Sequence, residues 1–214
     1  AGLGGLEDAE TEQLLDTLNH FFRPAGIRFY ACGPPNSIQS DAHYRLSTID
    51  ETALCGPNDR SGAINIYVVD ELLFNSISIC GYAYFPGSLD RVLLDADCAR
   101  NGNTIVHELG HYLGLEHTFS GGCGTASEPG CYTSGDLICD TNSESGPVFS
   151  PCQVGASNTC GSVDPSDNYM DYSDDLCMMR FTQEQVRRMR CSLETYRTQI
   201  WEAGAGNEIF GDGF

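Results

Sequence analysis

The chain reads HELGHYLGLEH over residues 107–117, and this stretch carries its strongest pattern. His107 and His111 are four residues apart, so on a helix their imidazoles project from one face toward a shared ligand. Gly114 adopts backbone angles that other residues avoid, which lets the chain turn sharply and bring back His117 as a third nitrogen donor. Three histidine ligands with an open fourth position are typical of a catalytic zinc site, and Glu108 is placed to act as its general base.

A second pattern, NYMDYSDD, covers residues 168–175. Met170 follows His117 by 53 residues and is expected in a tight turn that forms an apolar floor beneath the metal. Tyr172 is expected to donate a hydrogen bond to the oxyanion that forms during catalysis. The alternative for Met170 is ordinary core packing, since methionine is a common gap filler.

Together these two patterns resemble the metzincin clan of metalloproteases. The sequence HTF at residues 117–119, with NYMDYSDDLC at 168–177, is similar to the pappalysin family. The segment GDLICDT at 135–141 also resembles that family, although Asn142 stands where a proline is often found. The resemblance covers roughly residues 60–195 and is most specific around the histidines.

The resemblance implies an α+β, zincin-like fold. A mixed sheet and the active-site helix would form an upper subdomain, and a loop-rich lower subdomain would carry a C-terminal helix, with a cleft between the two. We expect one catalytic domain over residues 1–203, with its upper subdomain at about 1–114 and its lower one at about 115–203, followed by a Gly/Asp-rich tail at 204–214. Periodicity and turn signals predict helices at 7–22, from 103–104 to 114 and from Thr182, and strands at 27–31, 62–69, 77–85 and 91–95.

The activity that the resemblance implies is peptide-bond hydrolysis by zinc-activated water. Protein or peptide substrates would pair with the edge strand that contains Tyr82, Ala83 and Tyr84. The pocket for the residue after the cleaved bond would be floored by Asp175 or Asp174, which favours basic residues, or by Leu176, which makes the pocket apolar. Two alternatives are a zinc-binding pseudoenzyme or adhesion module, and a metal-dependent amidase acting on small substrates. A general base beside the ligands argues against the first. An edge strand able to pair with an extended peptide would favour proteolysis over the second, and a closed pocket would favour the amidase. The alternative for residues 81–85 is an ordinary core strand.

Eleven cysteines in 214 residues indicate an oxidising compartment and several disulfides. The resemblance suggests that Cys131 pairs with Cys160 and Cys152 with Cys177. It also implies a structural calcium site with oxygen ligands from Asp136, Asp140 and Thr141. The alternative for these three residues is a polar surface loop.

The chain carries 30 acidic and 11 basic residues, for a formal net charge of −19. Such a surface repels phosphate backbones, so nucleic acid is not expected as a partner. No apolar run approaches the roughly 20 residues that span a bilayer, so membrane insertion is not expected. Because the chain begins at Ala1 without a basic-then-apolar leader, we expect a secreted, processed form whose inhibitory pro-segment has been removed.

Overall fold

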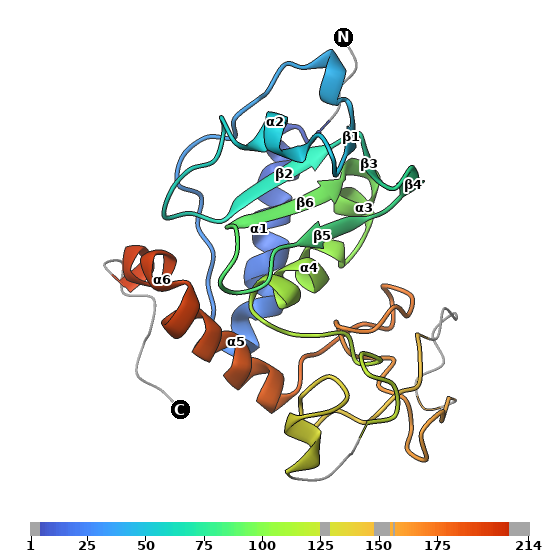
Figure 1. The fold of residues 1–214 in the computed structure, drawn as a ribbon. Coiled ribbons are helices and arrows are strands. Elements are labelled where there is room, and N and C mark those ends of the chain that lie inside the picture. The colour runs from blue at the N-terminus through green and yellow to red at the C-terminus, as the bar shows by residue number, and fades with distance from the viewer. Residues whose placement is uncertain (1–4, 125–128, 148–154, 156, 206–214) are drawn as a thin grey trace. The chain divides into compact units, whose positions relative to one another are not determined.

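The computed structural model describes residues 5–124, 129–147, 155 and 157–205. These residues divide into two compact units: one runs up to Tyr112 and resumes at Leu193, and the other is Leu113–Ser192. Figure 1 shows the order of the elements along the chain.

The first unit holds both sheets and most of the helices. Its helices are α1 (Asp8–Phe22), η1 (Arg23–Ala25), η2 (Asp41–His43), α2 (Glu51–Cys55), α3 (Ala96–Asn101), α4 (Thr104–Tyr112), the end of α5 (Gln183–Tyr196) and α6 (Thr198–Ala205). Its strands are β1 (Arg45–Ser47), β2 (Asn65–Val69), β3 (Glu71–Phe74), β4 (Ile77–Ser78), β5 (Gly81–Ala83) and β6 (Arg91–Asp95). The second unit holds η3 (Gly130–Tyr132) and the larger part of α5.

One mixed three-stranded sheet supports the helix that carries the histidines. β2 runs parallel to the central strand β6, and β5 runs antiparallel to β6 with Gly81 opposite Leu94, so β5 lies at an edge (Figure 1). The other sheet has the order β1-β3-β4. All five residues of β6 are buried, as expected for a strand covered on both faces.

Helix α4 packs against β5 and β6 and also contacts α1. Side chains alternate across a strand, so neighbouring residues of β6 face different partners. Leu93 belongs to a buried cluster with Leu54 and Cys55 of α2. Leu94 lies on the opposite face, because a Cβ built on its partner Gly81 would meet both Leu94 and Glu108 of α4. The sheet is therefore covered on both faces: the cluster with α2 packs on one face, and α4 packs on the other.

Two strand predictions differ from the structure. Residues 27–31 form no strand, because the Asn19 side chain binds both main-chain groups of Phe29: it accepts from the amide at 2.7 Å and donates to the carbonyl at 3.0 Å. The predicted strand at 77–85 is split between β4 and β5, which belong to different sheets. Cys80 lies at this break and forms a disulfide with Cys98.

The second unit is mostly loop, and disulfides crosslink it. The predicted Cys131–Cys160 pair is wrong, since the structure joins Cys131 to Cys139 and Cys160 to Cys123. A tight turn, in which Leu137 has a φ of +64°, folds the chain back so that the α-carbons of Cys131 and Cys139 lie 5.1 Å apart.

Cys177 is disulfide-bonded, and its predicted partner Cys152 lies outside the described residues. The capping box predicted for α5 is confirmed: the Gln185 amide donates to Thr182 Oγ1, and the Thr182 amide donates to Gln185 Oε1. In the part of the chain that the structure describes, every helix is too short or too polar to cross a membrane.

Candidate active site

Helix α4 presents two of the three predicted metal ligands on one face. Its first turn begins at the Asn103 carbonyl, which accepts from the amides of Val106 and His107 at 2.9 and 3.0 Å. His107 and His111 are buried, each 7% exposed. Their Nε2 atoms lie 3.1 Å apart and their rings are nearly perpendicular, at 87°. Their spacing of four residues has the geometric effect that the sequence predicts.

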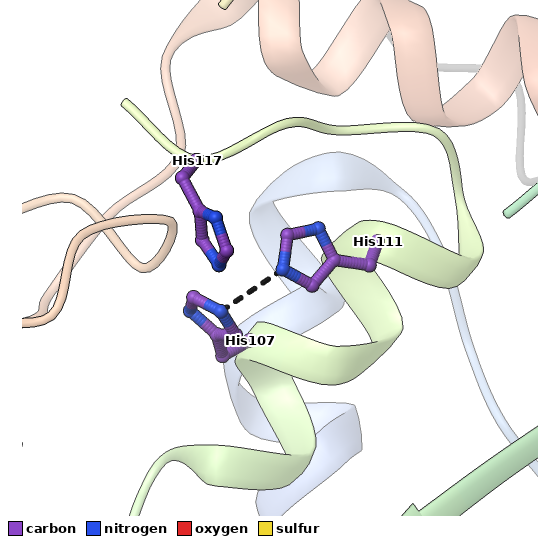
Figure 2. Close-up of side chains that lie close together, drawn as sticks. All are labelled: His107, His111 and His117. Atoms are coloured by element: carbon purple, nitrogen blue, oxygen red, sulfur yellow. Dashed lines mark hydrogen bonds between the residues drawn. The ribbon is translucent and has the colours of Figure 1, made fainter. Parts of the chain in front are cut away.

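The third histidine joins this pair after a glycine turn. Gly114 has a φ of +91°, a region that glycine enters without steric cost. One nitrogen of each of His107, His111 and His117 lies within 4.8 Å of the others, and Figure 2 shows the three rings pointing toward one another. Two nitrogens bound to a tetrahedral zinc at about 2.0–2.1 Å lie about 3.3 Å apart. The donors and their separations therefore fit one zinc ion.

Glu108 is buried beside the histidine pair, with 7% of its surface exposed. Burial raises the pKa of its carboxyl group to about 8, and the charge of a bound cation would oppose this shift. Gly81 of β5 leaves the room that the side chain needs. A Cβ at this glycine would lie 3.0 Å from Glu108 Cγ and 3.0 Å from the Leu93 carbonyl oxygen.

The predicted substrate-binding strand directs its side chains to two different faces. The hydroxyls of Tyr82 and Tyr84 donate to Glu51 Oε2 at 2.6 and 2.7 Å, and Arg91 donates to the other oxygen of the same carboxylate. Both tyrosine side chains are thus anchored on α2. Ala83 lies between the two tyrosines, so its side chain points to the opposite face of the strand. An extended peptide at this edge would therefore pair with main-chain groups.

The predicted Met-turn is held by buried amides. Met170 is fully buried, and its carbonyl accepts from the Thr118 amide at 3.1 Å. Asn168 Oδ1 accepts from the main-chain amide of Met170 at 2.9 Å, and the side-chain Nδ2 of Asn168 donates to Gln185 Oε1 at 2.8 Å. Met170 is therefore tied to the residue that follows His117.

Tyr172 lies against the third histidine. Its ring centroid is 4.7 Å from that of His117 and 5.0 Å from that of Phe119, whose ring stacks on His117. Tyr172 is 42% exposed. The structure thus brings Tyr172 beside a predicted metal ligand, with its ring open to solvent.

The three residues predicted to bind calcium already have partners within the chain. Asp136 accepts from the Ile138 amide at 3.1 Å and from Thr141 Oγ1 at 2.6 Å. Asp140 accepts from the Glu184 amide at 2.9 Å. Burial raises the pKa of Asp136 to about 6, and the hydroxyl of Thr141 partly opposes that shift. Within the described residues, the three histidines are the one group of three or more His, Cys, Asp or Glu side chains gathered closely enough for a metal.

Glu144, which the sequence offers only as a weaker candidate calcium ligand, is a buried carboxyl group. It is fully buried, and its Oε2 accepts from Thr118 Oγ1 at 3.0 Å. Burial raises the pKa of Glu144 to about 8, and the neighbouring charge of Asp171 adds to the shift. Glu144 therefore favours its protonated form near neutral pH.

The three candidates for the floor of the specificity pocket differ in exposure. Asp174 is exposed, and its Oδ1 accepts from the Leu176 amide at 3.2 Å. Asp175 is half-buried. Leu176 is 85% exposed.

The sequence predicts Gly81 and Phe85 as the ends of the rim strand, but not their contacts with the residues of the zinc motif. The Phe85 ring lies 5.3 Å from the His111 ring, and Gly81 lies against Glu108. The alternation of small or apolar residues with tyrosines over 81–85 is the signal that indicates which face of the strand is turned toward α4.

Comparison with known proteins agrees with this geometry. The sequence model of the peptidase M43 family, described as pregnancy-associated plasma protein-A, matches residues 57–194. An extracellular metalloprotease of Pyricularia oryzae is 33% identical over 92% of this chain and 71% of its own length. An extracellular metalloprotease of Verticillium alfalfae is 39% identical over 92% of this chain and 73% of its own length.

A solved structure supports the fold independently. Mature mirolysin of Tannerella forsythia, in complex with a cleaved peptide, superposes with a TM-score of 0.74 at 23% identity, covering 97% of this chain and 93% of that one. The α+β, metzincin-like fold class predicted from the sequence is therefore confirmed.

Proposed function

Because this chain belongs to the peptidase M43 family, it is a metalloendopeptidase, and we propose that it cleaves proteins with a zinc ion held by His107, His111 and His117. The observation that carries this proposal is the cluster of three histidine nitrogens with a buried glutamate between the first two ligands. Zinc, when bound, acts as a Lewis acid that lowers the pKa of water and polarises a carbonyl group.

Three residues of the chain support the reaction around the metal. The Glu108 carboxylate accepts a proton from the attacking water and then donates it to the leaving amine nitrogen. Tyr172, whose ring lies against His117, donates a hydrogen bond to the developing oxyanion. Met170 packs as the apolar floor of the ligand set, which its complete burial supports.

Substrates are extended peptide segments that add to the free edge of β5. Since the side chains of Tyr82 and Tyr84 are occupied by Glu51, these residues and Ala83 take part through the main chain. Specificity after the cleaved bond depends on the acids Asp174 and Asp175 or on Leu176, and a proteome-wide peptide digest distinguishes basic from apolar preference.

The protein is proposed to be secreted, because its relatives are extracellular metalloproteases and because it contains disulfides. A pro-segment that blocks the site is proposed as well, because the similar mirolysin is named as a mature form. Residues 1–203 are proposed as one catalytic domain, followed by the tail.

Structural calcium at Asp136, Asp140 and Thr141 remains a proposal for the turn of the second unit. Calcium added to zinc-loaded protein in metal-free buffer should raise the melting temperature, and Asp136→Asn should abolish that rise. A melting temperature insensitive to millimolar calcium contradicts the site.

The test of the main proposal compares wild type with Glu108→Ala on a whole-proteome peptide library read by mass spectrometry. Glu194→Gln, an exposed glutamate of α5, is the matched control. We expect cleavage by wild type and by the control, and nearly complete loss in Glu108→Ala with the zinc content unchanged. Undiminished cleavage by Glu108→Ala would refute the role of Glu108 as general base. No cleavage by zinc-loaded wild type would refute the proposed endopeptidase activity.

A further inference from the structure

A buried arginine beyond the zinc motif holds the segment that follows the edge strand. Arg197, between α5 and α6, is 4% exposed. Its Nη2 donates to the carbonyl oxygens of Tyr84 and Phe85 at 2.8 and 3.0 Å. Its Nη1 donates to the carbonyl oxygens of Ser88 and Leu89, both at 3.2 Å. One guanidinium group therefore binds the main chain at both ends of the turn from 84 to 89.

The same guanidinium is also linked to helix α4. Nη1 forms an ion pair with Asp90 at 2.6 Å, and the Tyr112 hydroxyl donates to the same Asp90 oxygen at 2.7 Å. The central carbon of the guanidinium lies 3.9 Å over the Tyr112 ring. Tyr112 directly follows the metal ligand His111, so Arg197 connects the turn to the helix that carries the ligands.

The turn that Arg197 binds places Phe85 against the zinc site. The Phe85 ring lies 5.3 Å from the His111 ring at a tilt of 41°. The main-chain carbonyl of Phe85 is one of the groups that Arg197 binds. Arg197 binds the carbonyl oxygens of Tyr84 and Phe85, on both sides of the Phe85 Cα, and so restrains the backbone that carries the Phe85 ring.

We propose that Arg197 is a positioning residue for the metal centre, acting through Phe85 to fix the His111 ring and the end of the substrate-binding edge. The proposal rests on the proposed zinc peptidase function. A planar guanidinium offers donors in a fixed fork, whereas a lysine ammonium is a point charge that cannot reach both pairs of carbonyls at once. Arg197→Lys therefore keeps the charge but loosens the turn.

The experiment compares Arg197→Lys, Phe85→Ala and the double variant with wild type, and uses Arg190→Lys, an exposed arginine of α5, as the control. Two properties are measured: the rate of zinc release to a colorimetric chelator, and kcat and KM for a fluorogenic peptide. Groups that orient metal ligands typically change metal affinity or activity 10- to 100-fold. We expect zinc release about 10-fold faster in each single variant, a raised KM, and wild-type behaviour in the control.

The double variant separates positioning from general stability. If Arg197 acts through Phe85, the double variant releases zinc no faster than the faster single variant, because both changes remove one interaction. The proposal is overturned if the double variant releases zinc at a rate raised by the product of the two single effects. It is also overturned if Phe85→Ala releases zinc at the wild-type rate. Phe85 is 39% exposed, so its truncation tests the idea even if Arg197→Lys folds poorly.

The absorption spectrum of the cobalt-substituted protein provides a readout that needs no catalysis. The ligand-field bands of cobalt report the arrangement of its ligands, and we expect the same altered bands in both single variants. If zinc-loaded wild type cleaves no peptide, the proposed function fails, while the zinc-release and cobalt measurements still decide the role of Arg197. Bands identical to those of wild type in both variants contradict that role.

Discussion

A single methyl group at Gly81 should slow catalysis while leaving the metal in place. In Gly81→Ala the new Cβ would lie 3.0 Å from each of three atoms: Glu108 Cγ, the Leu93 carbonyl oxygen and Leu94 Cδ2. Non-bonded carbon atoms rest at about 3.5–4.0 Å, so the contact with Glu108 is too short by about 0.5–1 Å. The Leu93 oxygen belongs to the backbone of the central strand, so the side chains must give way.

The expected cost follows from this displacement. An error of about 1 Å in the position of a reacting group lowers the rate about 100-fold, so we expect kcat to fall about 10- to 100-fold. Overpacking should also lower the free energy of unfolding by about 1–3 kcal/mol. Zinc content should not change, because the contact falls on Glu108 rather than on a histidine.

The assay measures kcat on a fluorogenic peptide, zinc by elemental mass spectrometry, and unfolding by urea titration. Gly146→Ala is the control, since a Cβ there would meet nothing within 4 Å, and it should match wild type in kcat. Wild-type kcat in Gly81→Ala would show that the Glu108 side chain has free space, and the steric argument would then be wrong.

Three further predictions concern other parts of the chain. Tyr172→Phe should lower kcat about 100-fold with little change in KM, as expected for the loss of one oxyanion donor. A non-reduced digest should yield peptides that link Cys131 to Cys139, and none that link Cys131 to Cys160. The pKa of Glu144 is raised in the folded state to about 8, so the folded state binds its proton more tightly than the unfolded chain does. Its contribution to stability should be complete below about pH 4.3 and be lost as the pH rises to about 8, at no more than about 1.4 kcal/mol per pH unit.

Each of these predictions has a direct check. Tyr169→Phe changes a buried tyrosine and should leave kcat unchanged, so equal losses in the two tyrosine variants would argue against a specific donor. For the pH prediction, urea titrations of zinc-loaded wild type and Glu144→Gln are compared from pH 4.5 to 8.5. As the pH rises, the free energy of unfolding of Glu144→Gln should increase steadily relative to that of wild type. A difference independent of pH would mean that Glu144 titrates normally in the folded protein.

The features that the sequence predicts correctly depend on local spacing. The interval of four residues between His107 and His111 places both rings on one face of α4, and the interval between Thr182 and Gln185 produces the capping box. The strand at 91–95 is an apolar run bounded by turns, and it is found with those bounds.

The features that it misses depend on contacts that hydrophobic periodicity and residue spacing do not determine. The strand expected at 27–31 is absent because the Asn19 amide binds the main chain of Phe29. The choice of Cys139 over Cys160 as the partner of Cys131 depends on how a loop folds, which cysteine spacing does not determine. Gly81 becomes a site residue only once β5 lies against α4.

The two anchors of the edge strand have a practical consequence for the limits of the catalytic unit. Glu51, which binds the tyrosines of the strand, and Arg197, which binds the turn after it, both lie outside the matched residues 57–194. A recombinant fragment cut at those limits would contain all three histidines and Glu108 but neither anchor. Such a fragment would also lack α1 and α2, which pack against α4 and the sheet. It should therefore hold zinc less tightly than the full chain and present a less ordered edge strand to its substrate.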